Sequence, residues 1–200
     1  LHLYLQYCLI QHQLGNTPQF SHAQRSWTQS RGEYFTAQEI VRHWKRRVPQ
    51  GAHVDEQLFL ALLFMMLRTP DPVLDKHQQD QRLRRAIVRM VARFRSQTGM
   101  NFSDEQGLTD QLYIHLAQAL DRSLFEIGID NSLPEEIHRL YPRLLRTTKE
   151  ALFELEAEFG LRFSDEEMSL VAVIFGAWLM QETDLHEKQE GRKNGKRKNQ

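Results

Sequence analysis

The chain has 200 residues, of which 40% are hydrophobic and 26% charged, with a formal net charge of zero. This composition is typical of a globular protein of one or two domains. A single cysteine, Cys8, excludes an internal disulfide framework and fits a reducing, cytoplasmic setting. The longest apolar runs, 58–67 and 169–180, are shorter than a membrane span of about 20 residues, so we expect no membrane association.

The two halves of the chain carry opposite charge. Residues 1–100 contain 14 Lys/Arg and 7 Asp/Glu, a net of +7, whereas residues 101–200 contain 12 and 19, a net of −7. Halves of opposite sign can attract each other or a second copy of the chain. The alternative is that their solvated faces simply differ in charge.

Apolar residues recur three and four positions apart through nearly the whole chain, and no segment alternates as a strand would, so we predict an all-α fold. Gly99 and Gly160 stand where helices are expected to end. Four segments have Ser or Thr followed three positions later by Glu or Gln, the capping-box pattern of a helix start. They are Thr36–Glu39, Ser103–Gln106, Ser132–Glu135 and Ser164–Glu167.

The chain also contains a long internal repeat. When the sequence is shifted by 111 residues, "DEQLFLALLF" at 55–64 falls on "EEMSLVAVIF" at 166–175, and three N-terminal leucines fall on leucines within 112–120. A repeat of this length predicts two related helical units, the first incomplete at its N-terminus. Chance similarity between amphipathic helices is the alternative.

Composition divides the chain into four parts. We expect a degenerate helical domain at 1–68 and a complete one at 81–183, joined by the proline-containing polar segment 69–80, which is typical of a linker. Residues 184–200 have almost no apolar side chain, so we expect a disordered tail. Its last ten residues hold five Lys/Arg and no acid, a composition that attracts nucleic acid weakly or serves only solubility.

The predicted helix at about 81–97 has one apolar stripe and one arginine-rich side. The stripe, expected to face the core, consists of Leu83, Ile87, Met90, Val91 and Phe94. The exposed side carries Arg82, Arg84, Arg85, Arg89, Arg93 and Arg95.

Enzyme signatures are absent from the sequence. It has no glycine-rich phosphate loop, no Gly-x-Ser-x-Gly elbow and no His-Glu-x-x-His motif. Its nine histidines are scattered without the fixed spacing of metal ligands. We therefore expect no catalytic activity, no metal site and no cofactor.

One histidine lies in an unusual setting. In "LYIHLAQALDR" at 112–122, His115 adjoins the apolar stripe of a predicted helix, and Arg122 follows two turns later on the same face. A histidine in this place is either a structural residue at a helix interface or an ionisable group with a function.

Residues 81–180 resemble a PTS regulation domain, the PRD, of bacterial transcriptional antiterminators and activators that respond to the sugar phosphotransferase system. The resemblance rests on a first amphipathic helix, a "G-x-x-F" turn, and "LYIHLAQALDR", which is similar to the family's His-Leu-x-x-Ala-Leu-x-Arg. "IDNSLPEEIHRLYPRL" and "GLRFSDEEMSLVAVIF" follow in the family's order. The resemblance implies tandem five-helix bundles, with residues 1–68 similar to a second, degenerate copy.

The resemblance also implies phosphoacceptor histidines, usually two in each domain. In the downstream unit His115 matches the first acceptor position, whereas Ile174 stands at the second. In the upstream unit the two positions are occupied by Tyr4 and Leu63. One of four acceptor positions therefore keeps its histidine, and we expect Ile174 and Leu63 to add core contacts instead.

Two further residues are candidates to support the acceptor. Arg122 can donate two hydrogen bonds to a phosphoryl group, and Glu167 can instead hold His115. By resemblance, the chain is a regulatory module that forms a homodimer, receives phosphate from phosphotransferase-system phosphocarrier proteins, and contacts nucleic acid through a domain outside this chain. The alternative is a helical dimerisation or protein-interaction domain without phosphate control. Because the chain begins at Leu1 rather than Met, we expect a fragment of a longer protein.

Overall fold

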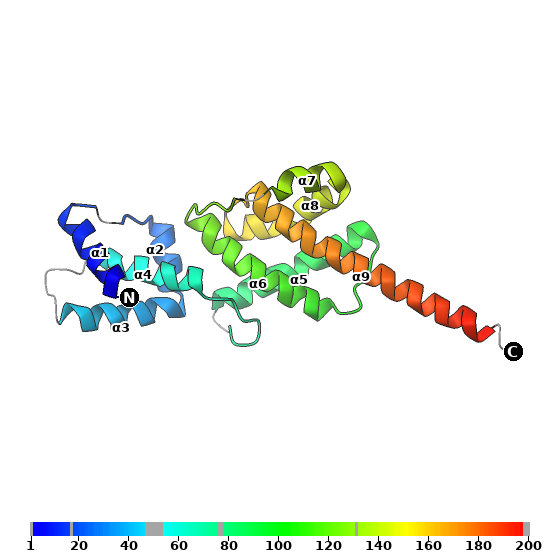
Figure 1. The fold of residues 1–200 in the computed structure, drawn as a ribbon, viewed down its shortest axis with the longest axis horizontal. Coiled ribbons are helices and arrows are strands. Elements are labelled where there is room, and N and C mark those ends of the chain that lie inside the picture. Colours follow the sequence, from blue (N-terminus) through cyan, green and yellow to red (C-terminus); the bar gives the residue numbers. More distant parts are fainter. Residues whose placement is uncertain (1, 17, 47–53, 76–77, 131, 198–200) are drawn as a thin grey trace. The chain divides into compact units, whose positions relative to one another are not determined.

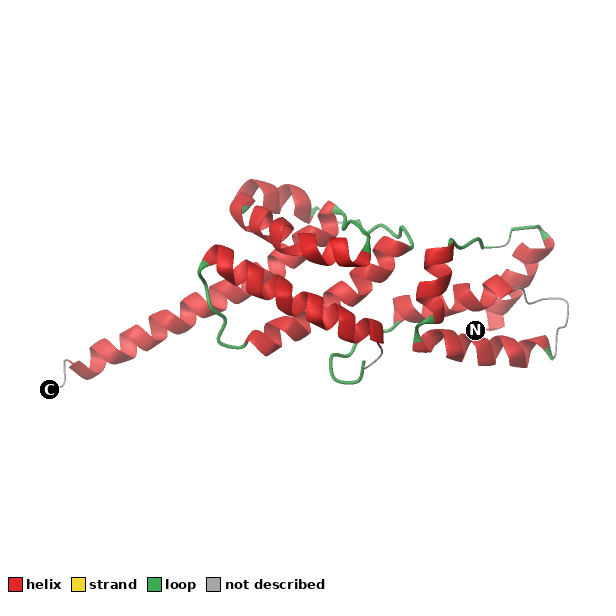
Figure 2. Ribbon diagram, turned by 180° about the vertical axis from the view of Figure 1, so that it is seen from behind, coloured by secondary structure: helices red, strands yellow, loops and turns green. Residues whose placement is uncertain are grey.

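A computed structural model describes residues 2–16, 18–46, 54–75, 78–130 and 132–197, with the backbone alone at 2, 4, 5, 8, 9, 12, 54 and 186–197. The described residues form helices and loops and no strand, which confirms the all-α prediction (Figure 2). Within this part of the chain, no helix is both long and apolar enough to cross a membrane. The chain divides into two compact units, Leu1–Thr69 and Pro70–Gln200.

The helices of the first unit are α1 (His2–Gln13), α2 (His22–Gln29), α3 (Gly32–Lys45) and α4 (Val54–Leu67) (Figure 1). Helices α3 and α4 pack through a small core of Ala37, Val41, Leu60 and Ala61. The two alanines allow the helices to approach closely. Ion pairs at the edge of this core are Arg25–Asp55 and Arg68–Glu33.

The helices of the second unit are α5 (Gln78–Thr98), α6 (Glu105–Leu124), α7 (Leu133–Leu140), α8 (Pro142–Phe159) and α9 (Asp165–Arg197) (Figure 1). They form the expected five-helix bundle, and all five residues of the predicted apolar stripe of α5 are buried. The rings of Phe94 on α5 and Phe175 on α9 stack with centroids 3.8 Å apart, and Phe102 packs beside both. This aromatic cluster joins α9 to α5.

The two units share one order of helices. Adding 111 to the bounds of α2, 22 and 29, gives 133 and 140, which are the bounds of α7. The same shift places α1 on the second part of α6, α3 inside α8, and α4 on the first part of α9. The first unit thus repeats the last four helices of the second, which confirms the tandem architecture.

Helix starts follow the predicted capping pattern only in part. The Glu167 N–H donates to Ser164 Oγ at 3.3 Å, as predicted. Thr36 lies inside α3, so that prediction is wrong. Ser132 is the N-cap residue of α7, as predicted, but its side chain makes no cap hydrogen bond. A capping box that was not predicted lies at 21–24, at the start of α2.

The start of α6 also differs from the prediction, because a helix distant in sequence supplies a partner. Asp104, not Ser103, is the cap residue, and its carboxylate accepts a hydrogen bond from the Gly107 N–H at 2.9 Å. The backbone and hydroxyl of Ser103 both donate to the buried carboxylate of Glu182 on α9, each at 2.7 Å. Glu182 thereby fixes the turn before α6.

Two boundaries of the second unit also differ from expectation. Helix α9 continues to Arg197, whereas we expected disorder from residue 184; Figure 1 shows its last turns projecting beyond the other helices of the unit. Residues 184–197 are rich in Glu, Lys, Gln and Arg and contain no proline, a composition that favours helix. The expected linker 69–80 packs onto the second unit, since Asp75 is buried and accepts a hydrogen bond from the Tyr113 hydroxyl at 3.0 Å.

The arginine-rich side of α5 faces acidic residues of α8. Arg82 and Arg89 both bind Glu158, and Arg93 binds Glu154 one turn earlier on α8. These side chains are partly exposed, so each pair adds little stability. The pairs neutralise charge, however, and α5 is therefore not an uncompensated cationic surface.

Candidate functional site

Helix α6 holds His115 at the margin of the bundle. The apolar stripe of α6 is buried as predicted, with Leu112 and Leu116 fully enclosed. His115 lies next to this stripe, and 16% of its side chain is exposed. The ring is thus held by packing on one side while part of it reaches the surface.

Helix α9 supplies the facing carboxylate from its first turn. Glu167 follows Ser164, whose hydroxyl caps the helix, and its side chain is 4% exposed. Asp165, Glu166 and Glu167 all favour the positive N-terminal end of α9. Of these three acids, Glu167 is the one that turns inward to α6.

Glu167 joins the two predicted residues of α6. Arg122 donates from Nε to Glu167 Oε1 at 2.6 Å and from Nη2 to Oε2 at 3.1 Å. His115 Nε2 lies 3.2 Å from Glu167 Oε2, but its direction does not meet the geometry of a hydrogen bond. The structure therefore brings His115, Arg122 and Glu167 into one cluster in which the carboxylate is central.

The electrostatics of the cluster favour an ionised Glu167. Burial opposes ionisation, but the contacts with His115 and Arg122 outweigh it and hold the pKa of the Glu167 carboxyl below its ordinary value. A carboxylate with a lowered pKa is a poor proton donor at neutral pH. Its chemical role here is to bind Arg122 and to face the histidine ring.

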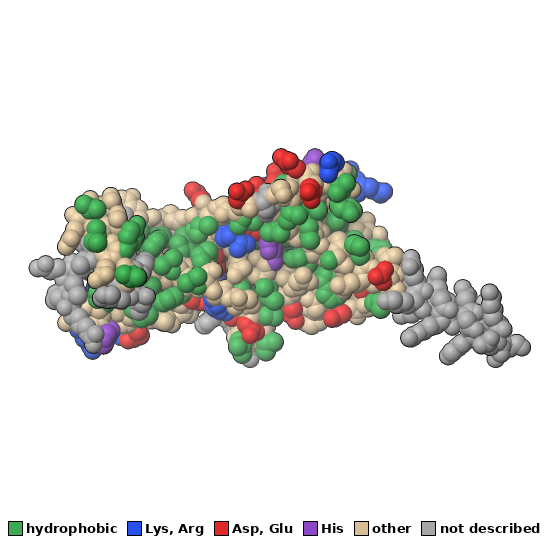
Figure 3. Space-filling view, viewed as in Figure 1, with side chains coloured by type: hydrophobic (Ala, Val, Ile, Leu, Met, Phe, Trp, Pro, Cys, Tyr) green, Lys and Arg blue, Asp and Glu red, His purple; other side chains and the backbone are tan. Residues whose placement is uncertain are grey.

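The cluster reaches the surface of the second unit. Figure 3 shows a histidine and a basic side chain between α6 and α9, with hydrophobic side chains around them. The side chains of His115 and Arg122 are 16% and 18% exposed. A reactant can therefore approach the cluster from outside, although only a small part of either side chain is open.

The structure describes the side chains of two of the other predicted acceptor positions and only the backbone of the third. Ile174 lies on α9 two turns after Glu167, and Leu63 lies on α4 of the first unit. Both side chains are half-buried, and the core contacts expected of them remain a prediction. Helix α1 carries Tyr4, but its side chain lies outside the described part of the structure.

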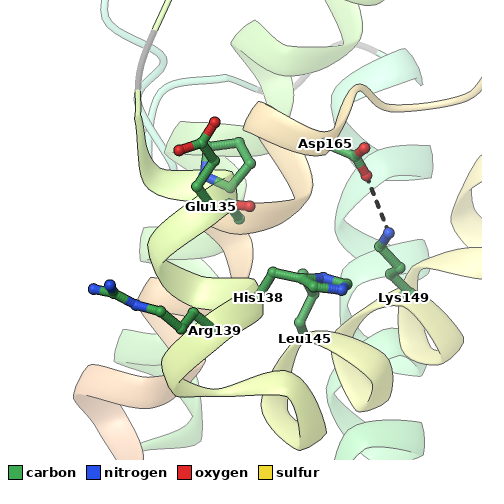
Figure 4. Close-up of a pocket in the computed structure, with 8 residues that line it drawn as sticks. Glu135, His138, Arg139, Leu145, Lys149 and Asp165 are labelled. Carbon is green, nitrogen blue, oxygen red and sulfur yellow. Dashed lines mark hydrogen bonds and ion pairs between the residues drawn. The ribbon is translucent and has the colours of Figure 1, made fainter.

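A second polar feature was not predicted from the sequence. A cavity of about 390 Å³ lies between α7, α8 and the first turns of α9 (Figure 4). It is lined by Pro134, Glu135, His138, Arg139, Leu145, Lys149, Asp165 and Ser169. No sequence motif marks it, because its residues come from three helices. Among the described residues, no group of His, Cys, Asp or Glu has the arrangement of a metal site.

Comparison with known proteins identifies the second unit. The family model described as "PRD domain" matches residues 88–178, which span His115, Arg122 and Glu167. This part of the chain belongs to the PRD family. The match covers most of the five-helix bundle, so the resemblance predicted from the sequence is confirmed.

Two known proteins are similar to the chain over more residues than the PRD match covers. Stationary phase-inducible protein CsiE of Escherichia coli (strain K12) is 64% identical over 187 residues, which are 94% of this chain and 44% of that protein. Transcriptional regulator ManR of Bacillus subtilis (strain 168) is 23% identical over 124 residues, 62% of this chain and 19% of that protein. The chain thus spans less than half the length of either relative. No solved structure matches it.

Proposed function

We propose that the chain is the regulatory part of a bacterial transcription regulator or antiterminator-like protein, and that His115 of its PRD accepts a phosphoryl group from a phosphocarrier protein of the sugar phosphotransferase system. The observation that carries the proposal is the contact of a partly exposed His115 with Glu167, which itself binds Arg122. A nucleophilic ring, an orienting carboxylate and a cation for phosphate are the groups that such a transfer uses.

The transfer needs an imidazole nitrogen with a free lone pair. We propose that the proton stays on Nε2 of His115, which lies 3.2 Å from Glu167 Oε2, and that the lone pair is therefore on Nδ1. In the proposed step, Nδ1 attacks the phosphorus of the carrier's phosphohistidine. One P–N bond forms as the other breaks, and the carrier's imidazole leaves as the neutral ring.

The phosphoryl group would change the electrostatic interactions within the cluster. It carries about two negative charges, which repel the ionised carboxylate of Glu167 and attract the guanidinium of Arg122. Arg122 now donates two hydrogen bonds to Glu167, and it can donate the same pair to phosphate. We propose that this exchange of partners between α6 and α9 is the switch that phosphorylation operates.

The proposal includes a homodimer and a nucleic-acid-binding domain outside this chain. Figure 3 shows hydrophobic side chains on one face of the second unit, which supports an interface there. The printed name of ManR, a transcriptional regulator, supports a role in transcription. Direct contact with nucleic acid by this chain would be weak and confined to the basic residues 191–200, since Arg82, Arg89 and Arg93 of α5 bind acidic side chains of α8.

A second candidate function is a helical dimerisation or protein-interaction domain that phosphate does not control. It is favoured by the loss of histidine at Ile174, Tyr4 and Leu63. In that case the contact of His115 with Glu167 has a structural role only, as a side chain that covers the Arg122 ion pair.

One experiment separates the two functions. The full chain is incubated with phosphoenolpyruvate and the general phosphotransferase proteins, and acid-labile phosphate is measured. We expect label on the wild type and on His138→Ala, which removes an exposed histidine of the same unit, and no label on His115→Ala. An unlabelled wild type, or equal label in His115→Ala, contradicts phosphoacceptance by His115. Light scattering of the same samples tests the homodimer, which a mass of one chain would exclude.

A further inference from the structure

The wall of the cavity between α7, α8 and α9 contains a buried hydroxyl that makes no hydrogen bond to any described residue. Ser169 is 1% exposed and its Oγ has no hydrogen-bond partner among the described residues. A buried hydroxyl without a partner is unfavourable, so a native structure usually supplies one. Beside it, Leu145 belongs to the apolar cluster of Ile137, Leu145 and Ala172. The inner wall thus combines apolar surface with one hydroxyl that a ligand can satisfy.

The mouth of the cavity presents both signs of charge. Lys149 Nζ lies 3.0 Å from Asp165 Oδ1, and their side chains are 42% and 67% exposed. An ion pair this exposed is weak and opens at little cost. Figure 4 shows the ring of His138 beside Leu145, close to Lys149, while the side chain of Arg139 extends away from these residues. Glu135 lies on the α7 side, so the cations and carboxylates of the lining are nearly balanced.

From these features we propose that the cavity binds a small zwitterion with an apolar side chain, such as a free apolar amino acid. Its carboxylate would accept hydrogen bonds from Lys149 and the Ser169 hydroxyl, and its ammonium would bind Asp165. Its apolar side chain would cover Leu145 and Pro134. The volume of about 390 Å³ suits such a ligand, since small-molecule pockets range from about 300 to about 1,000 Å³.

The balance of charge in the lining selects this ligand class. A ligand with a carboxylate but no ammonium would face Asp165 and Glu135 without compensation. A ligand with an ammonium but no carboxylate would face Lys149 in the same way. A zwitterion inserts between Lys149 and Asp165 and gives each of them a partner, so neither charge is left without one.

The cavity adjoins the elements that hold the His115 cluster. Asp165 and Ser169 are four residues apart on α9 and share one face of the helix, whereas Glu167 lies between them and points to α6. The two sites thus use opposite sides of the same two turns. The proposed ligand site does not rest on phosphorylation of His115, since none of its lining residues belongs to the His115 cluster.

The test uses three probes that share the leucine side chain: L-leucine, which carries both charges, N-acetyl-L-leucine, which lacks the ammonium, and L-leucinamide, which lacks the carboxylate. Each is titrated into the full chain, and binding is followed by chemical-shift changes of backbone amides in α7, α8 and the start of α9. We expect L-leucine to bind at least about tenfold more tightly than either blocked probe, because each blocked probe loses one charge-assisted contact. No saturable shift with L-leucine overturns the proposal, and equal binding of all three probes overturns its charge selectivity.

Variants of the full chain locate the site. We expect Ser169→Ala and Lys149→Met each to weaken L-leucine binding by about fivefold, the loss of one hydrogen bond or one exposed charged contact. Thr148→Val is the matched control, because Thr148 is also a buried hydroxyl without a partner among the described residues but does not line the cavity. Arg93→Met is the control for loss of a surface ion pair. Unchanged binding in both Ser169→Ala and Lys149→Met would place the ligand elsewhere and overturn the proposal.

Discussion

Arg122 and Glu167 link α6 to α9, with hydrogen bonds of 2.6 and 3.1 Å from one guanidinium to one carboxylate. The side chains are 18% and 4% exposed. At this depth, loss of one partner leaves an uncompensated charge in the protein, whereas loss of both leaves none. Both helices also carry residues of the proposed switch, so this ion pair connects the stability of the PRD to its function.

The first prediction concerns this ion pair. We expect Glu167→Ala to lower the free energy of unfolding of the second unit by about 2 kcal/mol, because Arg122 and His115 lose their carboxylate while keeping some access to water. The double variant Arg122→Met, Glu167→Leu should recover most of that loss. Trp178 fluorescence during urea unfolding reports the second unit alone once Trp27 and Trp44 are replaced by phenylalanine. Equal destabilisation in the single and double variants would show that packing, not charge, is responsible.

The second prediction is a pH dependence with a defined sign. The pKa of Glu167 is lowered in the folded protein, so its ionised form contributes stability above the pKa of about 4.3 in the unfolded chain. That contribution is lost as the pH falls through the lower folded value. The difference in unfolding free energy between wild type and Glu167→Gln should therefore shrink between about pH 6 and about pH 3. Glu154→Gln, at a half-exposed site, should show a much smaller change.

The third prediction tests the packing of the first turn of α6 against the middle of α9. A Cβ at Gly107 would lie 2.9 Å from Trp178 Cη2 and 2.4 Å from Asp104 Oδ2. Gly107→Ala should therefore destabilise the second unit by about 1–3 kcal/mol, as over-packing usually does. Gly128→Ala is the control, since no heavy atom lies within 4 Å of its Cβ position. Equal stability of the two variants, measured by urea unfolding, would contradict this packing.

The fourth prediction concerns the segment before α5. The Tyr113 hydroxyl is buried and donates to Asp75 Oδ2 at 3.0 Å, and the Asp71 N–H donates to the same oxygen at 2.9 Å. We expect Tyr113→Phe to cost about 1–2 kcal/mol and to speed amide hydrogen exchange at 71–75. Tyr141→Phe, at a ring that is 54% exposed, should change neither quantity. Unaltered exchange in Tyr113→Phe would mean that the segment is held by other contacts.

Local and repeating signals in the sequence predicted most of the fold. The 111-residue repeat located the helices of both units, and the glycines expected to end α5 and α8 have the positive φ values of helix ends, 71° at Gly99 and 67° at Gly160. The prediction of a helix cap failed where a residue distant in sequence takes the hydrogen bond of the expected cap residue. Ser103 looked like a cap by spacing, but it binds Glu182, which lies 79 residues later.

The residues of the candidate site could be predicted from the sequence, but the contacts between them could not. Spacing along α6 placed His115 and Arg122 on one face, and the family motif pointed to Glu167. Nothing in the sequence indicates that one carboxylate contacts both, since this depends on how α9 packs against α6. The cavity was missed for the same reason, because its lining is gathered from three helices.

The most direct test of the account is to locate the phosphate on the chain. The full chain is phosphorylated with phosphoenolpyruvate and the general phosphotransferase proteins, digested at neutral pH, and analysed by tandem mass spectrometry under conditions that preserve phosphohistidine. We expect a single phosphorylated histidine, His115, and greater hydrogen exchange at the start of α9 as Arg122 leaves Glu167. Phosphate on a different histidine, or a chain that stays unmodified while a control phosphotransferase substrate is fully labelled, would contradict it.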